Sequence, residues 1–456
     1  MKTIKNGLAA GILLLFPLIS AAEEGAGRQS PGQTDMSGSA AKTRLIESVA
    51  AVVETNYVFP DVAAKVAAFL RERLRSGAYE DIATAERLTR ALTEDMRSVS
   101  RDFHLGVVEN RRLPPGAADA AGGPGSASSP AAKTIPLRNF GFQQAIRMPG
   151  NIGCLVIDEL AELESEGDSA AWKTALAALR FVCHAQALII DLRDNFGGGE
   201  EMAVGLLSYV FDRPTHLLTK HDREKQGERE IWTTQPAEEG NLARIPLIVL
   251  TSRHTVSGGE MFAYVLKNRK RAAIVGEKTR GAAHYTHLFP LPDLPFTVAV
   301  PVGTTTDPVT GTNWEGTGVE PDIAVEAGKA LDAAYRKALR AVLASDAPAL
   351  LKQEARWALP EVEARLDPPP PTVQNAQDYE GAYGKHRVTA REGFLFCALN
   401  QGDAKRIVPL VEGLFAFEDK GLFYVRLQFF RDGTGAVSGL RLVYDTGQQQ
   451  DVAQNR

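Results

Sequence analysis

The sequence predicts an α/β core with a largely parallel sheet, preceded by a small helical domain and followed by a small all-β domain. Three observations lead to this fold class. Apolar residues recur at helical spacing within 43–110, strand-like and helix-like segments alternate within 137–346, and short alternating runs with turn residues fill 377–456. A chain of 456 residues is also too long for one compact core.

The N-terminus has the pattern of a secretory signal, which we place at residues 1–22. Lys2 and Lys5 are followed by the apolar run Gly7–Ile19, and small residues precede Glu23. The run is short for a bilayer span, so we expect cleavage, no integral membrane span in the mature chain, and a periplasmic or secreted protein; a retained anchor is the alternative. Residues 23–42, rich in Gly, Ser and Gln, predict a disordered leader.

Three groups of apolar residues predict three helices in the domain 43–110. Their members are Leu45, Ile46, Val49, Val52 and Val53; then Val62, Val66, Phe69, Leu70 and Leu74; then Leu88, Leu92 and Met96. Thr84 is a candidate N-cap for the third helix, and Gly77 ends the second. Residues 111–136 are rich in Ala, Gly, Ser and Pro and predict a flexible linker.

The core, residues 137–346, alternates strands with helices, which favours parallel pairing. The predicted strands are Ile152–Ile157, Ala187–Asp191, Leu247–Thr251, Ala272–Gly276 and Phe296–Pro301, and the predicted helices are Ala170–Phe181, Glu200–Phe211 and Ala330–Leu343. Residues 347–376, which include the prolines 368–371, predict a second linker. In the C-terminal domain, Asp432-Gly433 and Thr446-Gly447 are turn signals between short strands.

Charge and cysteine content narrow the classes of function. The net charge of −5 gives no indication of a nucleic-acid partner or an anionic membrane surface. Three cysteines in an exported chain allow one disulfide, for which Cys154 and Cys183 are the better candidates. No Cys/His spacing resembles a zinc site, so we expect neither a metal nor a cofactor.

Two strand–turn–helix junctions carry the chemistry that the sequence predicts. Leu247–Thr251 precedes Ser257 at one helix start, and Ala187–Asp191 precedes the glycine run 197–199 at another. A hydroxyl at one junction and bent backbone N–H groups at the other are what serine acyl transfer requires. Ser257 with Glu260 is equally a capping box, and the glycine run is equally a tight turn without a ligand.

A serine nucleophile needs a base, and the residues leave two histidines open. His104 lies where the helical domain joins the core, and His284 lies closer to the serine in sequence. Glu315, in a glycine-rich irregular segment, is a candidate for the acid that orients the base. Spacing alone does not choose among the carboxylates.

Four motifs together resemble the carboxy-terminal-processing (tail-specific) serine peptidase family. They are Leu188–Gly198, Thr255–Glu260, Val275–Gly281 and Gly318–Asp322, in family order and spacing over about 151–325. The helical segment, with Asn56–Pro60 and Asp102–Leu105, resembles the branch that contains interphotoreceptor retinoid-binding protein. No peptide-binding PDZ module is apparent in the sequence between the helical domain and the core.

The resemblance implies a crotonase-like core of ββα units, with Ser257 as the nucleophile. It implies an oxyanion hole formed by the backbone N–H of Gly258 and of the Gly197/Gly198 turn. The catalytic lysine of the tail-specific proteases would follow Gly281, where this chain has Ala282, and Lys278 lies off that position. A Ser–Lys dyad is therefore not expected.

The tricorn-like branch of the family uses Ser, His and Glu instead. His104 matches its histidine and Glu315 its glutamate, so the resemblance implies the triad Ser257, His104 and Glu315, with His284 in contact with substrate. We therefore expect an exported serine endopeptidase acting on extended peptides, unfolded protein or flexible tails. The alternatives are a catalytically idle carrier of a peptide or an apolar, retinoid-like or lipid-like ligand, and an esterase with the same triad.

Overall fold

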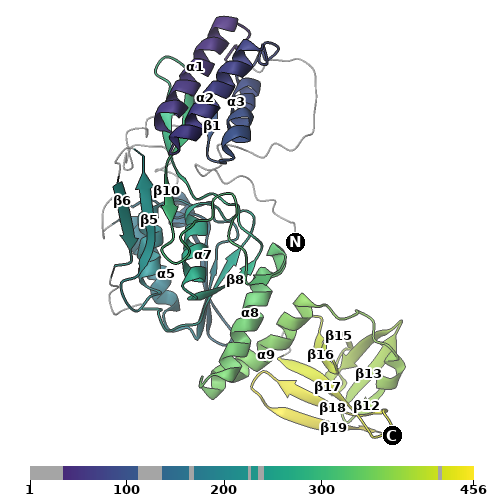
Figure 1. Cartoon of the computed structure of the whole chain (residues 1–456). Helices are drawn as coiled ribbons and strands as arrows, with labels where there is room; N and C mark the ends of the chain where they lie inside the picture. The colour runs from purple at the N-terminus through teal and green to yellow at the C-terminus, as the bar shows by residue number, and fades with distance from the viewer. Residues whose placement is uncertain are drawn as a thin grey trace. The chain divides into compact units, whose positions relative to one another are not determined.

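The computed structural model describes residues 34–110, 136–163, 169–223, 227–234, 241–419 and 424–455. These residues fall into two compact units. The first comprises residues 1–146, 154–183 and 190–327, and the second comprises 147–153, 184–189 and 328–456. The predicted signal, most of the predicted leader and the predicted linker 111–136 apart from its last residue lie outside the described residues. Figure 1 shows the order of the elements along the chain.

Three helices form the N-terminal part of the first unit, as predicted. They are α1 (Ser39–Asn56), α2 (Pro60–Arg75) and α3 (Ala85–Ser100). Thr84 caps α3 by accepting a hydrogen bond from the N–H of Arg87. The predicted leader boundary at residue 42 is wrong by several residues, because Met36 is only 2% exposed and packs into the helical core.

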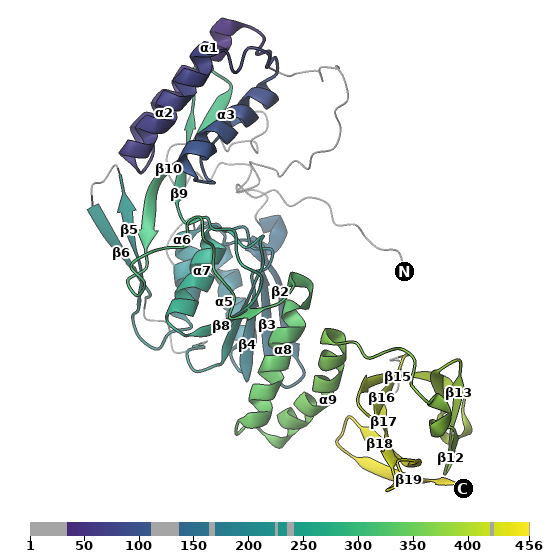
Figure 2. The same ribbon diagram turned by 45° about the vertical axis from the view of Figure 1, so that its right-hand side comes forward.

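A hairpin from the α/β core completes the apolar core of the helical region. It consists of β9 (Tyr285–Pro290) and β10 (Phe296–Thr306) and lies against the helices (Figure 2). Phe296, Val298 and Val300 of β10 belong to the same apolar core as the helices. β10 also pairs antiparallel with β1 (Gly106–Glu109), which follows α3. The hairpin therefore holds the chain around residue 104 close to the chain around residue 284.

β10 runs five residues beyond the predicted Pro301 because it pairs with three other strands. Its first half pairs with β1 and β9, and residues Gly303–Thr306 pair with β5 (His216–Asp222), which pairs in turn with β6 (Gly227–Trp232). This five-stranded antiparallel sheet was not predicted in full. Its partly polar strands lack the continuous apolar runs that identified the other strands.

A six-stranded sheet of order β11-β8-β7-β4-β3-β2 carries the two junctions of interest. Four of its strands match the predicted bounds: β3 (Ile152–Ile157), β4 (Ala187–Asp191), β7 (Leu247–Thr251) and β8 (Ala272–Gly276). The others are β2 (Phe142–Met148) and β11 (Ile323–Ala324), and the helices that follow strands are α5 (Ala170–Val182), α6 (Glu200–Ser208) and α7 (Gly258–Asn268). The pairs β7–β8 and β8–β11 are parallel, as expected for alternating elements.

The predicted linker 347–376 is wrong over much of its length, because α9 (Ala349–Leu366) lies within it, after α8 (Ala327–Ala344). Ala355, Ala358 and Val362 are buried at helical spacing, and this pattern outweighs Pro360 inside the helix. Among the described residues, short 3-10 segments are also present at Pro136–Gly141, Ala376–Tyr379 and Leu399–Gln401.

The C-terminal domain is all-β, as predicted, and closes into an eight-stranded antiparallel barrel around its own apolar core. Its strands are β12 (Gly381–Tyr383), β13 (His386–Arg391), β14 (Phe394–Ala398), β15 (Lys405–Val411), β16 (Leu414–Phe417), β17 (Val425–Arg431), β18 (Val437–Tyr444) and β19 (Gln449–Asn455).

The candidate pair Cys154 and Cys183 forms no disulfide, and both residues are free thiols. Cys154 is buried within β3, where burial raises its pKa to about 12. Cys183 lies at the end of α5 with its Sγ 3.1 Å from the carbonyl oxygen of Arg180. Within the parts of the chain that the structure describes, no helix has the length and apolar character needed to cross a membrane.

Candidate active site

Ser257 lies at the start of α7, six residues after β7 ends, and its backbone adopts a rare conformation. Its φ is 52° and its ψ is −115°, values at which a β-carbon is unfavourable and glycine is usual. The predicted capping box is present, and Glu260 accepts the Ser257 N–H at 2.9 Å. A cap needs no such conformation, since N-cap residues ordinarily have β-region φ and ψ. The strain therefore calls for a second explanation.

The glycine turn after β4 lies directly against Ser257. A β-carbon placed on Gly197 would be 2.8 Å from the β-carbon of Ser257, and one on Gly198 would be 1.9 Å from the carbonyl oxygen of Leu160. Both glycines have positive φ, 97° and 126°. Only glycine permits this turn to pass so close to the serine.

Some of the backbone N–H groups around the turn already donate a hydrogen bond within the protein, and others do not. Gly197 donates to Oδ1 of Asn195 at 2.9 Å. Gly198 forms a parallel bridge with Leu160, which uses the Gly197 carbonyl and the Gly199 N–H. The N–H groups of Gly198 and Gly258 have no hydrogen-bond partner among the described residues. A β-carbon on Gly258 would be 3.4 Å from the Gly198 nitrogen, so these two donors are neighbours.

Asn195 is a residue that sequence reasoning missed. Its side chain is fully buried, accepts the Gly197 N–H and donates to the carbonyl oxygen of Ile157 at 3.0 Å, while its own carbonyl accepts the Val256 N–H. It thereby fixes the glycine turn to the segment before Ser257. Its position two residues before Gly197 is the only sequence signal for this role.

The Glu260 carboxylate ties the serine to a second segment. It is fully buried and accepts four hydrogen bonds, from the hydroxyl of Thr279 and the N–H groups of Ser257, Gly281 and Ala282. Burial raises the pKa of Glu260 to about 7, while the four donors act in the opposite direction. The segment 279–282 is thus held beside the nucleophile candidate and leads directly into His284.

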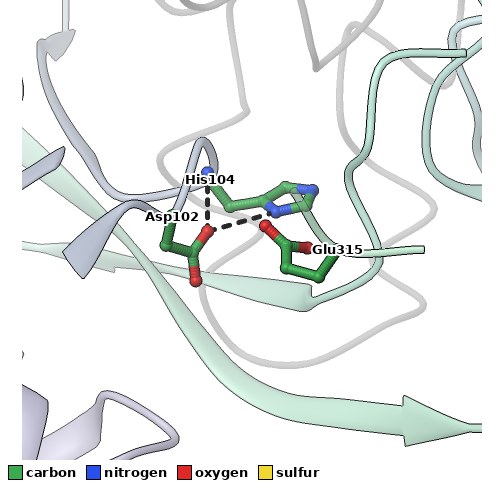
Figure 3. Close-up of side chains that lie close together, drawn as sticks. All are labelled: Asp102, His104 and Glu315. Carbon is green, nitrogen blue, oxygen red and sulfur yellow. Dashed lines mark hydrogen bonds and ion pairs between the residues drawn. The ribbon is translucent and has the colours of Figure 1, made fainter. Parts of the chain in front are cut away.

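His104 sits in a cluster with two carboxylates, drawn in Figure 3. One donor atom each from Asp102, His104 and Glu315 lies within 4.8 Å of the others. Asp102 is 1% exposed, and its Oδ1 accepts the His104 N–H at 2.9 Å and lies 3.4 Å from Nδ1 of the His104 ring. The structure therefore brings the predicted base and the predicted orienting acid together.

Glu315 is positioned by backbone donors from the same segment that contains His284. Its Oε2 accepts the N–H groups of Ala283 at 2.6 Å and His284 at 3.1 Å. Its own N–H donates to the side chain of Asn313, and the neighbouring Trp314 donates its indole N–H to the carbonyl oxygen of Ala282. The glycine-rich loop that the sequence predicts near the site is therefore hydrogen-bonded to the segment Ala282–His284 through both Trp314 and Glu315.

His284 contacts Asp102, which the sequence did not predict. Its Nδ1 lies 2.7 Å from Oδ2 of Asp102, and the hydroxyl of Tyr57 donates to the same oxygen at 3.0 Å. Burial acts to raise the pKa of Asp102, but its hydrogen bonds with His104 and His284 hold the pKa well below its usual value. Burial acts to lower the pKa of His284, but the bond and charge of Asp102 raise it.

Lys278 is the remaining candidate base, and the structure places it at the surface. Its Nζ pairs with Glu320 at 2.7 Å, and the two side chains are 52% and 64% exposed. Ala282, at the position where the resemblance would place a catalytic lysine, is fully buried. This arrangement agrees with the expectation that no Ser–Lys dyad forms.

Two family models match this chain. Residues 151–325, which contain Ser257, the glycine turn, His284 and Glu315, match the model described as Peptidase family S41. Residues 37–135, which contain Asp102 and His104, match the model described as the N-terminal domain of Peptidase_S41 in eukaryotic IRBP. These matches confirm the resemblance to carboxy-terminal-processing peptidases that the sequence motifs indicate.

Two curated relatives and one solved structure are similar to parts of this chain. The chain is 31% identical over 129 residues to carboxyl-terminal-processing peptidase 2, chloroplastic, of Arabidopsis thaliana, covering 28% of this chain and 24% of the relative. It is 34% identical over 109 residues to the carboxyl-terminal-processing protease of a Picosynechococcus strain, covering 24% and 25%. The chain thus spans about a quarter of the length of these relatives. A solved photosystem II D1 C-terminal processing protease gives a TM-score of 0.40 at 17% identity, covering 63% of this chain and 93% of that one.

Proposed function

We propose that this chain is a serine endopeptidase with Ser257 as its nucleophile. The observation that carries the proposal is the backbone of Ser257, held at φ 52° and ψ −115° on a strand-to-helix turn. Strained nucleophiles on such turns expose their hydroxyl above the carboxyl end of a sheet. The two free N–H groups of Gly198 and Gly258 beside it support an oxyanion hole made by these residues, with Gly197 shaping the turn.

His104 acts as the general base in this proposal. It takes the proton from the Ser257 hydroxyl as the oxygen attacks the scissile carbonyl, and the carbonyl oxygen gains negative charge between the two glycine N–H groups. His104 then gives the proton to the leaving amine, which departs and leaves an acyl-enzyme. In the second half of the reaction, His104 takes a proton from water as the water oxygen attacks the ester, and then returns that proton to the oxygen of Ser257 as the acid product leaves.

The carboxylates beside His104 orient its ring and stabilise its cation. Glu315 is the acid that the family resemblance implies, and the short contacts of Asp102 support a part for that residue too. A carboxylate next to the base stabilises the imidazolium that forms in the transition state. His284, placed against Asp102, takes the position of a supporting residue in addition to its proposed contact with substrate.

The substrate class and location are part of the same proposal. We take the core to be crotonase-like and residues 137–346 to be the peptidase domain. Extended peptides, unfolded protein and flexible protein tails are the proposed substrates, and the relatives named as carboxyl-terminal-processing proteases support this choice. The signal pattern at residues 1–22 supports a periplasmic or secreted location.

The test is cleavage of a denatured-peptide library by the purified mature chain, followed by mass spectrometry, with labelling by a fluorophosphonate in parallel. We expect wild type to cleave and to be labelled at Ser257. We expect Ser257→Ala to do neither and His104→Ala to lose several orders of magnitude in turnover. Cleavage by Ser257→Ala at the wild-type rate would overturn the proposal.

The second candidate is a carrier, favoured by the match of residues 37–135 to the N-terminal domain found in eukaryotic IRBP. A folded wild-type protein that neither cleaves peptides nor reacts with the fluorophosphonate would support the carrier. Labelling without peptide cleavage, together with hydrolysis of simple esters, would instead support an esterase with the same nucleophile.

A further inference from the structure

Three polar atoms in the His104 cluster are buried without a hydrogen-bond partner among the described residues. They are both ring nitrogens of His104 and Oε1 of Glu315; Nδ1 has only its 3.4 Å ion-pair contact with Oδ1 of Asp102, and the His104 side chain is only 6% exposed. A buried polar atom without a hydrogen-bond partner destabilises the folded protein. Three such atoms in one cluster indicate a binding site for a ligand that would satisfy them.

The two carboxylates of the cluster are held in the manner of metal ligands. Outer donors fix Oε2 of Glu315 through two backbone N–H groups, and Oδ2 of Asp102 through Tyr57 and His284. Oε1 of Glu315 has no hydrogen-bond partner among the described residues, whereas Oδ1 of Asp102 accepts the His104 N–H and lies 3.4 Å from Nδ1 of the ring. Outer-shell bonds of this kind orient carboxylates that bind metals.

The donor types and one of the donor spacings match zinc. A tetrahedral ion with ligand bonds of about 2.1 Å holds its donors about 3.4 Å apart, and Oδ1 of Asp102 lies 3.4 Å from Nδ1 of His104. One imidazole with two carboxylates is a donor set that zinc accepts, whereas magnesium and calcium prefer oxygen ligands alone. Two carboxylates also offer the negative charge that a divalent cation neutralises.

We infer that Asp102, His104 and Glu315 form an inhibitory zinc site. Zinc takes a lone pair of the His104 ring and fixes that ring between the carboxylates, so His104 no longer accepts the proton of Ser257. The inhibitory effect rests on the proposed peptidase function, but the binding of zinc does not. The ion is proposed here as an inhibitor and not as a catalytic cofactor, so its removal is expected to restore activity.

The binding test uses a protein in which peptidase activity plays no part. Isothermal titration of Ser257→Ala with zinc chloride is expected to give one ion per chain. Adding His104→Ala should weaken binding at least ~10-fold, and Glu315→Gln, which keeps one oxygen for the backbone donors, should weaken it by about 10–100-fold. Circular dichroism of each variant establishes that it is folded.

His254→Ala is the matched control. His254 is an exposed histidine 3.5 Å from Asp194, and the two side chains are 60% and 85% exposed. Unchanged zinc affinity in this variant supports the buried site. Unchanged affinity in His104→Ala, or loss of the ion in His254→Ala, would overturn the inference and assign the zinc to the surface.

The inhibition test is run on wild type. Zinc at the concentration that saturates Ser257→Ala should slow both peptide cleavage and fluorophosphonate labelling at least ~10-fold, and a chelator should restore both. Full activity with the site saturated would overturn inhibition. A chain that binds zinc through His104 but shows no cleavage in metal-free buffer would count against the peptidase function alone, so the two failures are distinguishable.

Discussion

The Nδ1 atom of His284 lies 2.7 Å from Oδ2 of Asp102, and both side chains are almost fully buried. The two residues are 182 positions apart in the sequence. One follows α3 in the helical region, and the other precedes β9, so the hydrogen bond joins two parts of the chain that match separate family models. The proposed active site therefore contains residues from both regions, Asp102 from the helical region and His284 from the core.

The pair predicts a pH-dependent contribution to stability. The pKa of Asp102 is depressed, so its contribution is present above its unfolded value of 3.8 and is lost as pH falls through the folded value. The pKa of His284 is raised, so its contribution is present below 6.5 and is lost as pH rises through the folded value. The stabilisation is therefore largest between pH 3.8 and 6.5.

His284→Gln tests this sign. We expect it to lower the free energy of unfolding by on the order of 2 kcal/mol near pH 5.5 and by less near pH 9. Urea titrations of both proteins across this range measure the difference. A deficit that grows toward high pH would contradict the assignment.

Ser257→Gly should stabilise the protein relative to Ser257→Ala. Both variants lose the hydroxyl, so both lose peptidase activity and any cap it provides. Only glycine adopts φ 52° without strain, so the gain in unfolding free energy is expected to be about 1 kcal/mol. Thermal unfolding of the two variants side by side measures it. Equal melting temperatures would show that this backbone stores no strain.

Asn195→Ala should lower kcat by about 10²-fold, the effect of losing one oxyanion donor. The reason is that Asn195 holds the Gly197 N–H and thereby sets the position of the Gly198 donor. Asn195→Asp retains the accepting oxygen and is the control, with a smaller loss expected. Steady-state kinetics, normalised to active sites by fluorophosphonate titration, separates kcat from KM. A change confined to KM would assign Asn195 to substrate binding.

Lys278→Ala should leave kcat/KM within about twofold of wild type, since surface ion pairs contribute little. Lys278 pairs with Glu320 at the surface, away from the buried Ala282. Peptide cleavage assays over pH 6–9 on Lys278→Ala beside His104→Ala measure the contrast. A large loss in the lysine variant with activity kept in the histidine variant would restore the Ser–Lys mechanism.

Because Cys154 and Cys183 are free thiols, we expect that reducing agents do not change the thermal stability of the protein. Cys154 and Cys183 are unpaired, so dithiothreitol should leave the melting temperature unchanged within about 1 °C, whereas loss of a native disulfide typically costs about 2–5 kcal/mol. Thiol titration of the denatured, non-reduced mature chain should count all three cysteines. A count of one would restore the disulfide.

The pattern of apolar residues along the sequence predicted those helices and strands whose residues are uniformly buried or follow a regular period of burial. β4 and β7 are buried at every position, so their continuous apolar runs identified their bounds. β5 and β6 carry charged, half-exposed residues and gave no such signal. α9 was missed because its proline and low amphipathicity resemble a linker, although three of its residues are buried.

The sequence by itself determined the nucleophile candidate, the glycine turn and the histidine candidates, because each lies in a short motif whose chemistry is local. Tertiary structure alone decided what surrounds them. Asp102 contacts His284, Glu260 binds the N–H of Ala282, and Asn195 binds the N–H of Gly197, because the fold brings these segments together. Of these contacts, only that of Asn195 is indicated by its position in the sequence, two residues before Gly197. The physical reason is that hydrogen bonds and the depressed pKa of Asp102 depend on distance in space and on burial, and neither is encoded in spacing along the chain.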